Sequence, residues 1–218
     1  MRKIKILLLT VFIAVGLHQA NGQAQLALGI KGGINLASLD GTTSPGTAYD
    51  NRTGYHLGAY FQIKFTKIAI QPEILFSQQG QKFTLNTGQS LSSNFDYISV
   101  PVMVKLYLVA GLNLQAGVQF GFLSSSSGDV YNTSTGAITN QDMGSFVHST
   151  DFSVPVGIGW DLPLGLNITA RYNIGISEVN KAAGDPNAQT IVTSMGTNAV
   201  KNQVFQFSIG FRLFKFGN

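Results

Sequence analysis

The sequence predicts an all-β protein, an eight-stranded antiparallel up-and-down transmembrane β-barrel with four long outer loops and three short periplasmic turns. Three observations predict this fold: an export signal, an apolar alternation of period two that recurs eight times after it, and the exclusion of charge from the apolar phase. The last segment is the clearest, because Phe205, Phe207, Ile209, Phe211 and Leu213 share one phase. Successive side chains of a strand point to opposite faces, so the two phases are the two faces of the wall.

The N-terminal segment 1–22 has the features of a cleaved signal peptide. A basic start precedes an apolar run from Ile6 to Leu17 that is too short to span a bilayer. Small residues follow, and we expect cleavage after Gly22, with Ala24 as the alternative. Residues 23–218 then form one barrel domain, which we expect in the outer membrane.

Removal of this signal changes what the charge implies. The full chain carries 14 Lys and Arg against 10 Asp and Glu, but Arg2, Lys3 and Lys5 leave with the signal, so 11 basic residues remain against 10 acidic ones. A nearly neutral domain argues against nucleic acid as a partner. The chain has no Cys, which excludes disulfides and thiol chemistry.

Eight segments carry the alternation, and each is long enough for a tilted membrane strand of about 9–11 residues. The predicted strands are 26–37, 55–65, 68–79, 95–108, 112–123, 151–162, 165–178 and 202–216. The long connections, rich in Gly, Ser, Thr and Asn, are 38–54, 80–94, 124–150 and 179–201. The tight turns are Thr66-Lys67, Val109-Ala110-Gly111 and Pro163-Leu164. Bacterial barrels keep their short turns in the periplasm, so the four long loops are expected outside the cell.

The distribution of charge separates a membrane barrel from a soluble one. Away from the strand ends, the apolar phase of the predicted strands carries no charged residue, and a charge facing lipid at the bilayer midplane costs about 2–4 kcal/mol. A soluble eight-stranded barrel, such as a lipocalin, would have charges outside and an apolar cavity inside. The opposite phase here is polar, as in Asn113, Gln115, Gly117 and Gln119, which favours a membrane barrel.

The phase that faces the barrel interior contains a set of charges that we expect to form a network. Its members are Lys31, Lys64, Glu73, Lys105, Asp151, Asp161, Arg171 and Arg212. An eight-stranded barrel is filled by side chains, and buried charges must be paired. Our hypothesis is that Glu73 is the hub, bridging Arg171 or Lys105 and also Arg212. The network is expected to be a structural plug, with a proton or ion path as the alternative.

Three prolines lie inside predicted strands, at positions 72, 101 and 155. Proline removes a donor from the hydrogen-bond ladder, so we expect bulges or strand bends there.

Three segments resemble a known family. They are Gly29-Ile30-Lys31-Gly32-Gly33-Ile34-Asn35 in the first predicted strand, Gln71-Pro72-Glu73-Ile74-Leu75-Phe76-Ser77-Gln78-Gln79-Gly80 in the third, and Tyr97-Ile98-Ser99-Val100-Pro101 in the fourth. Together they resemble the PorT-like outer-membrane β-barrel family, abundant in Bacteroidetes. The resemblance implies an eight-stranded outer-membrane barrel and no single activity. The namesake is tied to protein secretion across the outer membrane.

Enzyme and cofactor signals are weak. The expected mature chain has only His56 and His148, and neither a Ser-His-acid order nor a Gly-x-Ser-x-Gly elbow is present. The loop residues Asp129, Asp142 and Asp185 lack metal-ligand spacing. No Gly-rich phosphate loop precedes a helix, so no nucleotide site and no cofactor are predicted.

The expected function is therefore non-enzymatic. Beyond the outer-membrane lipid, we expect envelope or secretion proteins as partners, bound through loops 124–150 and 179–201 or the periplasmic rim, because long loops on a rigid scaffold carry binding functions. Apolar loop residues such as Ile138 and Val147 are expected either to extend the strands or to form a contact edge. A narrow transport conduit is the first alternative, and a lipid-modifying enzyme using His56 or His148 is the second.

Overall fold

The computed structural model describes residues 24–40, 48–84, 90–131, 137–144, 147–179 and 201–217. The predicted signal peptide lies outside the described residues, as does nearly all of the predicted loop 179–201. The described strands are β1 Gln25–Asp40, β2 Ala48–Phe65, β3 Ile68–Thr84, β4 Ser90–Tyr107, β5 Leu112–Tyr131, β6 Ile138–Asp142, β7 Thr150–Asp161, β8 Leu166–Gly175 and β9 Lys201–Phe216. A 3-10 turn, Pro163–Gly165, joins β7 to β8. Among the described residues no helix is both long and apolar enough to cross a membrane.

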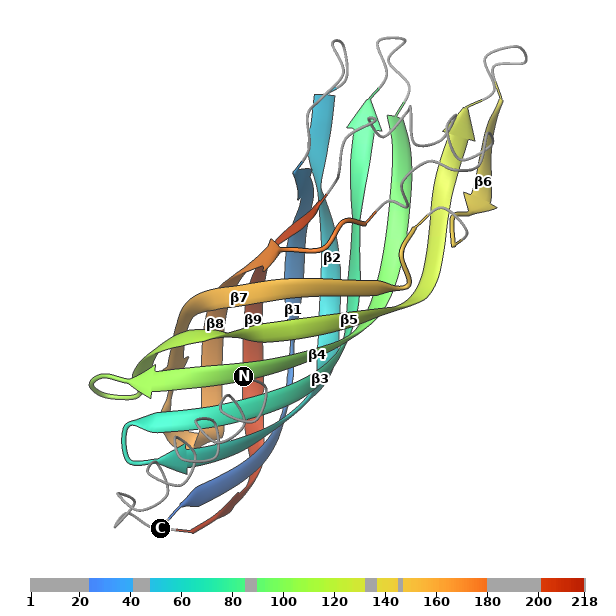
Figure 1. The fold of residues 1–218 in the computed structure, drawn as a ribbon. Coiled ribbons are helices and arrows are strands. Elements are labelled where there is room, and N and C mark those ends of the chain that lie inside the picture. Colours follow the sequence, from blue (N-terminus) through green and yellow to red (C-terminus); the bar gives the residue numbers. More distant parts are fainter. Residues whose placement is uncertain are drawn as a thin grey trace, which may run out of the picture.

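The strands close into a barrel. Neighbouring strands follow the order β4-β3-β2-β1-β9-β8-β7-β5, and β4 also pairs with β5, which closes the wall (Figure 1). All of these pairings are antiparallel. The predicted eight-stranded antiparallel barrel is confirmed. Strand β6 pairs with the outer end of β5 and is not part of the closed wall.

The two faces of the wall follow the alternation of the sequence. In β1 the apolar side chains Ile30 and Ile34 are 48% and 49% exposed, whereas Lys31 and Asn35 between them are 2% and 0% exposed. In β9 Ile209 is exposed and Ser208 beside it is buried. The apolar surface thus points outward and the polar side chains fill the inside, which is the arrangement a lipid environment requires.

The three predicted tight turns are confirmed, and each needs left-handed backbone. Thr66 has φ 42°, Ala110 φ 51° and Leu164 φ 64°. Gly111 has φ 84°, and a Cβ built there would collide with the carbonyl oxygen of Asp161. Glycine is therefore required at position 111 for both space and conformation.

Four strands are longer by five or more residues at their outer ends than the alternation predicts. Strand β2 begins at Ala48 instead of 55, β3 ends at Thr84, β4 begins at Ser90, and β5 continues to Tyr131. Parts of the predicted loops 38–54, 80–94 and 124–150 are therefore strand. We call the outer ends of β2–β5 together with β6 the raised sheet, which stands beyond β7 and β8 on one side of the barrel (Figure 1). Beyond the lipid neither face of a strand needs to be apolar. The apolar alternation therefore ends before the hydrogen-bonded strand pairing ends.

The bulges expected at the prolines are absent. Beside Pro72 the ladder skips from the pair Tyr60–Glu73 to the pair Ile63–Ile70 without any change of register. Register shifts lie elsewhere, between Leu28 and Gly29, between Asn51 and His56, and between Asp96 and Tyr97. A missing N–H removes a rung of the ladder but leaves the residue count unchanged, so proline alone does not force a bulge.

Candidate functional site

The centre of the barrel holds an ion-paired hub around Glu73. Arg171 Nη1 and Nη2 donate to the two carboxylate oxygens of Glu73 at 2.9 and 2.7 Å, and Lys31 Nζ lies 3.3 Å from both. Gln71 Nε2 adds a bond of 2.7 Å, while Arg171 Nε donates to Gln115 at 2.9 Å. The charged side chains are at most 1% exposed. Two cations thus share one carboxylate in a dry, hydrogen-bonded setting, where such pairs are strong.

The partners of Glu73 differ in part from the expected ones. Arg171 is one of the two alternative partners that we expected, whereas Arg212 does not contact Glu73 and Lys31, which we did not expect there, does. Lys31 stands opposite Gly58 in the register between β1 and β2, and Gly58 adds no side chain between Lys31 on β1 and Glu73 on β3. A Cβ built at Gly58 would collide with the Ile74 carbonyl oxygen, so this glycine allows β2 and β3 to approach closely, and the sequence holds no clear signal for the Lys31–Glu73 pair.

A chain of polar side chains connects the hub with the end of the barrel that carries the tight turns. Gln62 Nε2 donates to Gln71 at 2.9 Å and to the Tyr107 hydroxyl at 3.0 Å. The Tyr107 hydroxyl donates to Asp161 at 2.5 Å, and Lys105 Nζ lies 3.6 Å from the same carboxylate. Lys105 therefore pairs with Asp161 instead of Glu73, because it sits nearer the turns than the hub does.

The remaining predicted members of the network lie apart from the hub. Lys64 Nζ stands 3.6 Å from the centre of the Tyr107 ring. Asp151 is buried at the other end of the lumen, where it accepts a bond of 3.0 Å from Ser177. The side chain of Arg212 makes no hydrogen bond or ion pair with any residue in the described part of the chain, and it lines a pocket at the turn end. The eight charges thus form two ion-paired groups and three separate residues.

His56 forms a Ser-His-Asn arrangement that the sequence did not reveal. Its Nδ1 lies 2.7 Å from Asn35 Oδ1 and its Nε2 lies 2.8 Å from Ser208 Oγ. An amide oxygen can only accept, so Nδ1 carries the hydrogen and Nε2 accepts the bond from the hydroxyl. The order of groups resembles a catalytic triad. However, Ser208 is 1% exposed and Asn35 0%, so the hydroxyl faces no space that a substrate could enter.

An apolar cluster closes the outer end of the lumen. It consists of Phe95 and Tyr97 from β4 with Met143, Val147 and Val179, each at most 5% exposed. The backbone holds this cap in place, since His148 N donates to Val179 O and Leu123 N to Ser149 O, both at 2.8 Å. Val147 was expected to extend a strand or form a contact edge. It is instead packed inside the cap, because the lumen offers apolar partners that a sequence pattern does not show.

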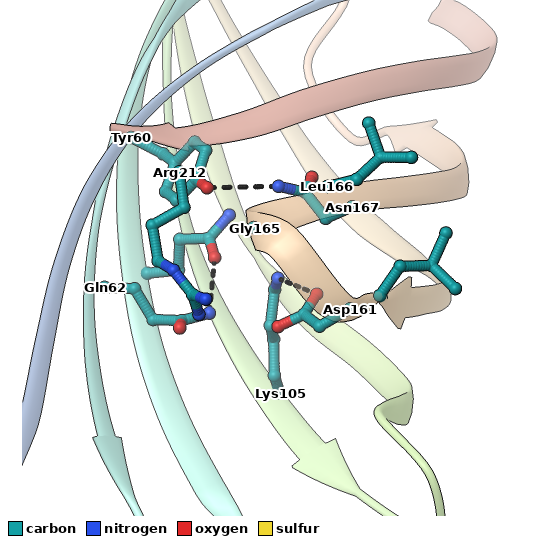
Figure 2. A pocket seen from close by; sticks show the side chains of 10 residues that line it. Tyr60, Gln62, Lys105, Asp161, Gly165, Leu166, Asn167 and Arg212 are labelled. Carbon is teal, nitrogen blue, oxygen red and sulfur yellow. Dashed lines mark hydrogen bonds and ion pairs between the residues drawn. The ribbon is translucent and has the colours of Figure 1, made fainter. Parts of the chain in front are cut away.

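The turn end of the lumen contains a small polar pocket beside the β7–β8 turn. Figure 2 shows the side chains of Arg212 and Lys105 entering it, with Tyr60 bonded to Asn167 at 3.0 Å across the opening. The enclosed space is about 10 Å³, room for one water-sized group. We call this the turn-end pocket.

A second, larger groove lies outside the lumen on the raised sheet. It encloses about 560 Å³ and is lined by Leu123, Ser124–Ser127, Asn140, Asp142 and Gly144. Asp142 Oδ1 accepts bonds from Gly144 N at 2.8 Å and Ser126 Oγ at 3.2 Å. Within the residues that the structure describes, no three His, Asp or Glu side chains gather as metal ligands would.

An apolar outer band around a polar, ion-paired interior defines the class of small transmembrane β-barrels. This chain belongs to the outer membrane protein beta-barrel domain family, whose model matches residues 19–180. It is an outer-membrane barrel protein.

Comparison with solved structures finds small barrels at low identity. The chain is similar to Neisserial surface protein A (NspA), with 10% identity, a TM-score of 0.46, and 88% of this chain and 100% of that chain covered. For Ail, the attachment invasion locus protein of Yersinia pestis, the identity is 14% and the TM-score 0.42, covering 88% and 99%. For OprG from Pseudomonas aeruginosa they are 12% and 0.41, covering 90% and 97%. Comparison with curated proteins gave no match.

Proposed function

We propose that this protein is a non-enzymatic docking protein of the outer membrane that binds a partner at the cell surface through the raised sheet. The observation that carries this proposal is the asymmetry of the outer end. Strand β5 has 20 residues and β8 has 10, so one side of the wall stands above the other. Beyond the lipid the added length brings no membrane anchoring, and rigid projecting structure of this kind serves recognition.

The raised sheet offers a partner both a ridge and a groove. All five residues of β6 are exposed, and the serine-lined groove runs beside this strand. Asp142 and Asn140 supply an acceptor and an amide at its border. The surface is polar, which suits a partner that binds and leaves in water.

The interior argues against the conduit alternative. Arg171 on β8 and Glu73 on β3 are four strands apart in either direction around the wall, so their ion pair crosses the lumen. The apolar cap lies beyond it at the outer end. A solute would have to break both, so we expect no stepwise conductance of the protein in planar bilayers.

The PorT-like resemblance supports partners from the envelope or a secretion system as a second possibility. The three segments that carry it contain Lys31, Glu73 and Tyr97, which are interior residues of the hub and the cap. The resemblance therefore concerns how the lumen is filled, and the partner's identity must come from the surface.

The test is photo-crosslinking in intact cells. A photoreactive residue at Thr139, exposed on β6, is expected to give one or two adducts at high yield, whereas the same residue at Lys67, exposed in the β2–β3 turn, is expected to give none of these adducts. With the photoreactive residue placed instead at Ser125, which is exposed and lines the groove, replacing residues 128–141 by an Asn-Gly turn should abolish the adducts, since Ser127 and Asp142 already face each other in the ladder. A barrel that folds normally and gives no Thr139 adduct would contradict the docking role.

A further inference from the structure

We propose that the turn-end pocket is a binding site for a small oxyanion, a carboxylate or phosphate group that enters the barrel from the periplasm. This proposal concerns the opposite end of the molecule from the raised sheet and does not depend on the docking role. It rests on the placement of charges, on the polar groups that line the pocket, and on its size.

The charges around the pocket are unbalanced. Two cations, Arg212 and Lys105, line the pocket with one carboxylate, that of Asp161, and a third, Lys64, lies nearby over the Tyr107 ring. Asp161 Oδ2 accepts a hydrogen bond from the Tyr107 hydroxyl at 2.5 Å, whereas Oδ1 lies 3.6 Å from Lys105 Nζ and accepts no hydrogen bond within the described residues. Cations in excess inside a partly dry site attract a counter-ion more strongly than on an open surface.

Arg212 is the residue most clearly available to a ligand. Its side chain enters the pocket between Gln62 and Tyr60 in Figure 2, and it makes no hydrogen bond or ion pair within the described ranges. The neighbouring amides are occupied, since Gln62 donates to Gln71 at 2.9 Å and Asn167 donates to Tyr60 at 3.0 Å. The guanidinium is thus the free donor of the pocket, and its planar fork suits the two oxygens of a carboxylate or phosphate.

A second cation completes the recognition. Lys105 is 1% exposed, and its ammonium lines the same pocket at a long distance of 3.6 Å from Asp161. An ammonium has three donors, so Lys105 can keep its carboxylate partner and also contact an incoming anion. The result is a site with a buried point charge on one side and a guanidinium fork on the other.

The size of the pocket limits the ligand. A space of about 10 Å³ has room for one water-sized group, so one oxygen of an oxyanion would enter it and the rest of the head group would stay at the opening. The pocket lies beside Gly165 of the β7–β8 turn, so the rest of a longer ligand would extend into the periplasm. The site therefore fits a free small anion or the terminal oxyanion group of a longer ligand whose remainder stays outside the pocket.

The test uses the purified full-length barrel in detergent, titrated calorimetrically with phosphate and with acetate at constant ionic strength. The wild-type protein is expected to bind at least one of them, and the better ligand identifies the oxyanion head. Arg212→Gln should weaken this binding about ten- to a hundredfold, the loss expected for a charged hydrogen bond. Lys215→Gln removes the same charge from an exposed position three residues further along β9, and should leave binding unchanged.

Stability gives an independent readout. Without added anion, the urea unfolding midpoint should be the same for Arg212→Gln and the wild type, because the Arg212 side chain bonds to no residue that the structure describes. Phosphate or acetate should raise the unfolding midpoint of the wild type and of Lys215→Gln, but not of Arg212→Gln. Absence of binding by the folded wild-type barrel, or equal binding by Arg212→Gln, would overturn the assignment.

Discussion

Arg171 and Glu73, 98 residues apart in the sequence, meet in a two-bond fork of 2.9 and 2.7 Å that spans the barrel from β8 to β3. These strands are diametrically opposite in the wall, so the ion pair bridges the lumen, and we call it the crossbeam. Lys31 adds a third charge from β1. Three strands are thereby fixed to one carboxylate, which links the interior chemistry to the rigidity of the scaffold.

Glu73→Gln tests this crossbeam. The change leaves Arg171 and Lys31 buried without a carboxylate, and removal of one partner of a buried pair costs about 3–5 kcal/mol. The measurement is urea unfolding of the refolded barrel in detergent. Glu178→Gln, at an exposed position after β8, is the matched control and should unfold like the wild type. Equal unfolding of both variants would mean that the hub does not stabilise the barrel.

Ile209→Arg tests which part of the wall faces lipid. Ile209 is 54% exposed on the outer face of β9, where a basic residue at the midplane costs about 2–4 kcal/mol. Thr139→Arg on β6 places the same charge above the membrane and should be nearly neutral. Both are compared by unfolding in phospholipid vesicles. A neutral effect at Ile209 would place the lipid boundary elsewhere.

Gly111→Ala tests the β4–β5 turn. The new methyl group would need φ near 84° and would collide with the Asp161 carbonyl oxygen, so we expect a loss of well over 1 kcal/mol. Ala110→Gly is the control, since it relieves a positive φ of 51° without adding an atom. The readout is the unfolding midpoint. Stability unchanged in Gly111→Ala would show that the turn relaxes freely.

Ser208 tests the enzyme alternative. Its bond to His56 is 2.8 Å, but the hydroxyl is buried, so a fluorophosphonate probe is expected not to label the folded barrel. Ser208→Ala should cost about 1–3 kcal/mol, because His56 Nε2 loses its partner. Phospholipid and lipid A of an overexpressing strain should stay unchanged. Labelling that disappears in Ser208→Ala would instead establish a serine hydrolase.

Some features were accessible from the alternation alone. Lipid on the outside and tight packing on the inside impose a period of two along every wall strand. The sequence pattern therefore predicts which side of the wall residues such as Ile30, Lys31 and Ile209 occupy. The positions of the turns follow too, because the apolar phase stops at Thr66, at Val109 and at Pro163. The strand count and the antiparallel fold were predictable for this reason.

Pairing inside the lumen was only partly predictable. The alternation placed Glu73 and Arg171 in one interior, but the register and closure of the strands decided that Lys31 also contacts Glu73 and that Lys105 pairs with Asp161. Which side chains from opposite walls meet depends on the strand tilt and the closure of the barrel. The sequence of a single strand determines neither of these. The Ser208 to His56 contact, 152 residues apart, was hidden for the same reason.

The sequence by itself determined the class of protein, its eight wall strands and which residues face lipid, because the solvent on each side imposes a local pattern. Only the tertiary structure decided the raised sheet, the cap formed by Met143 and Val147 on Phe95, and the free guanidinium of Arg212 in the turn-end pocket. In water both faces of a strand tolerate polar residues, and inside the lumen partners come from distant strands. Both depend on three-dimensional closure, for which a linear pattern carries no signal.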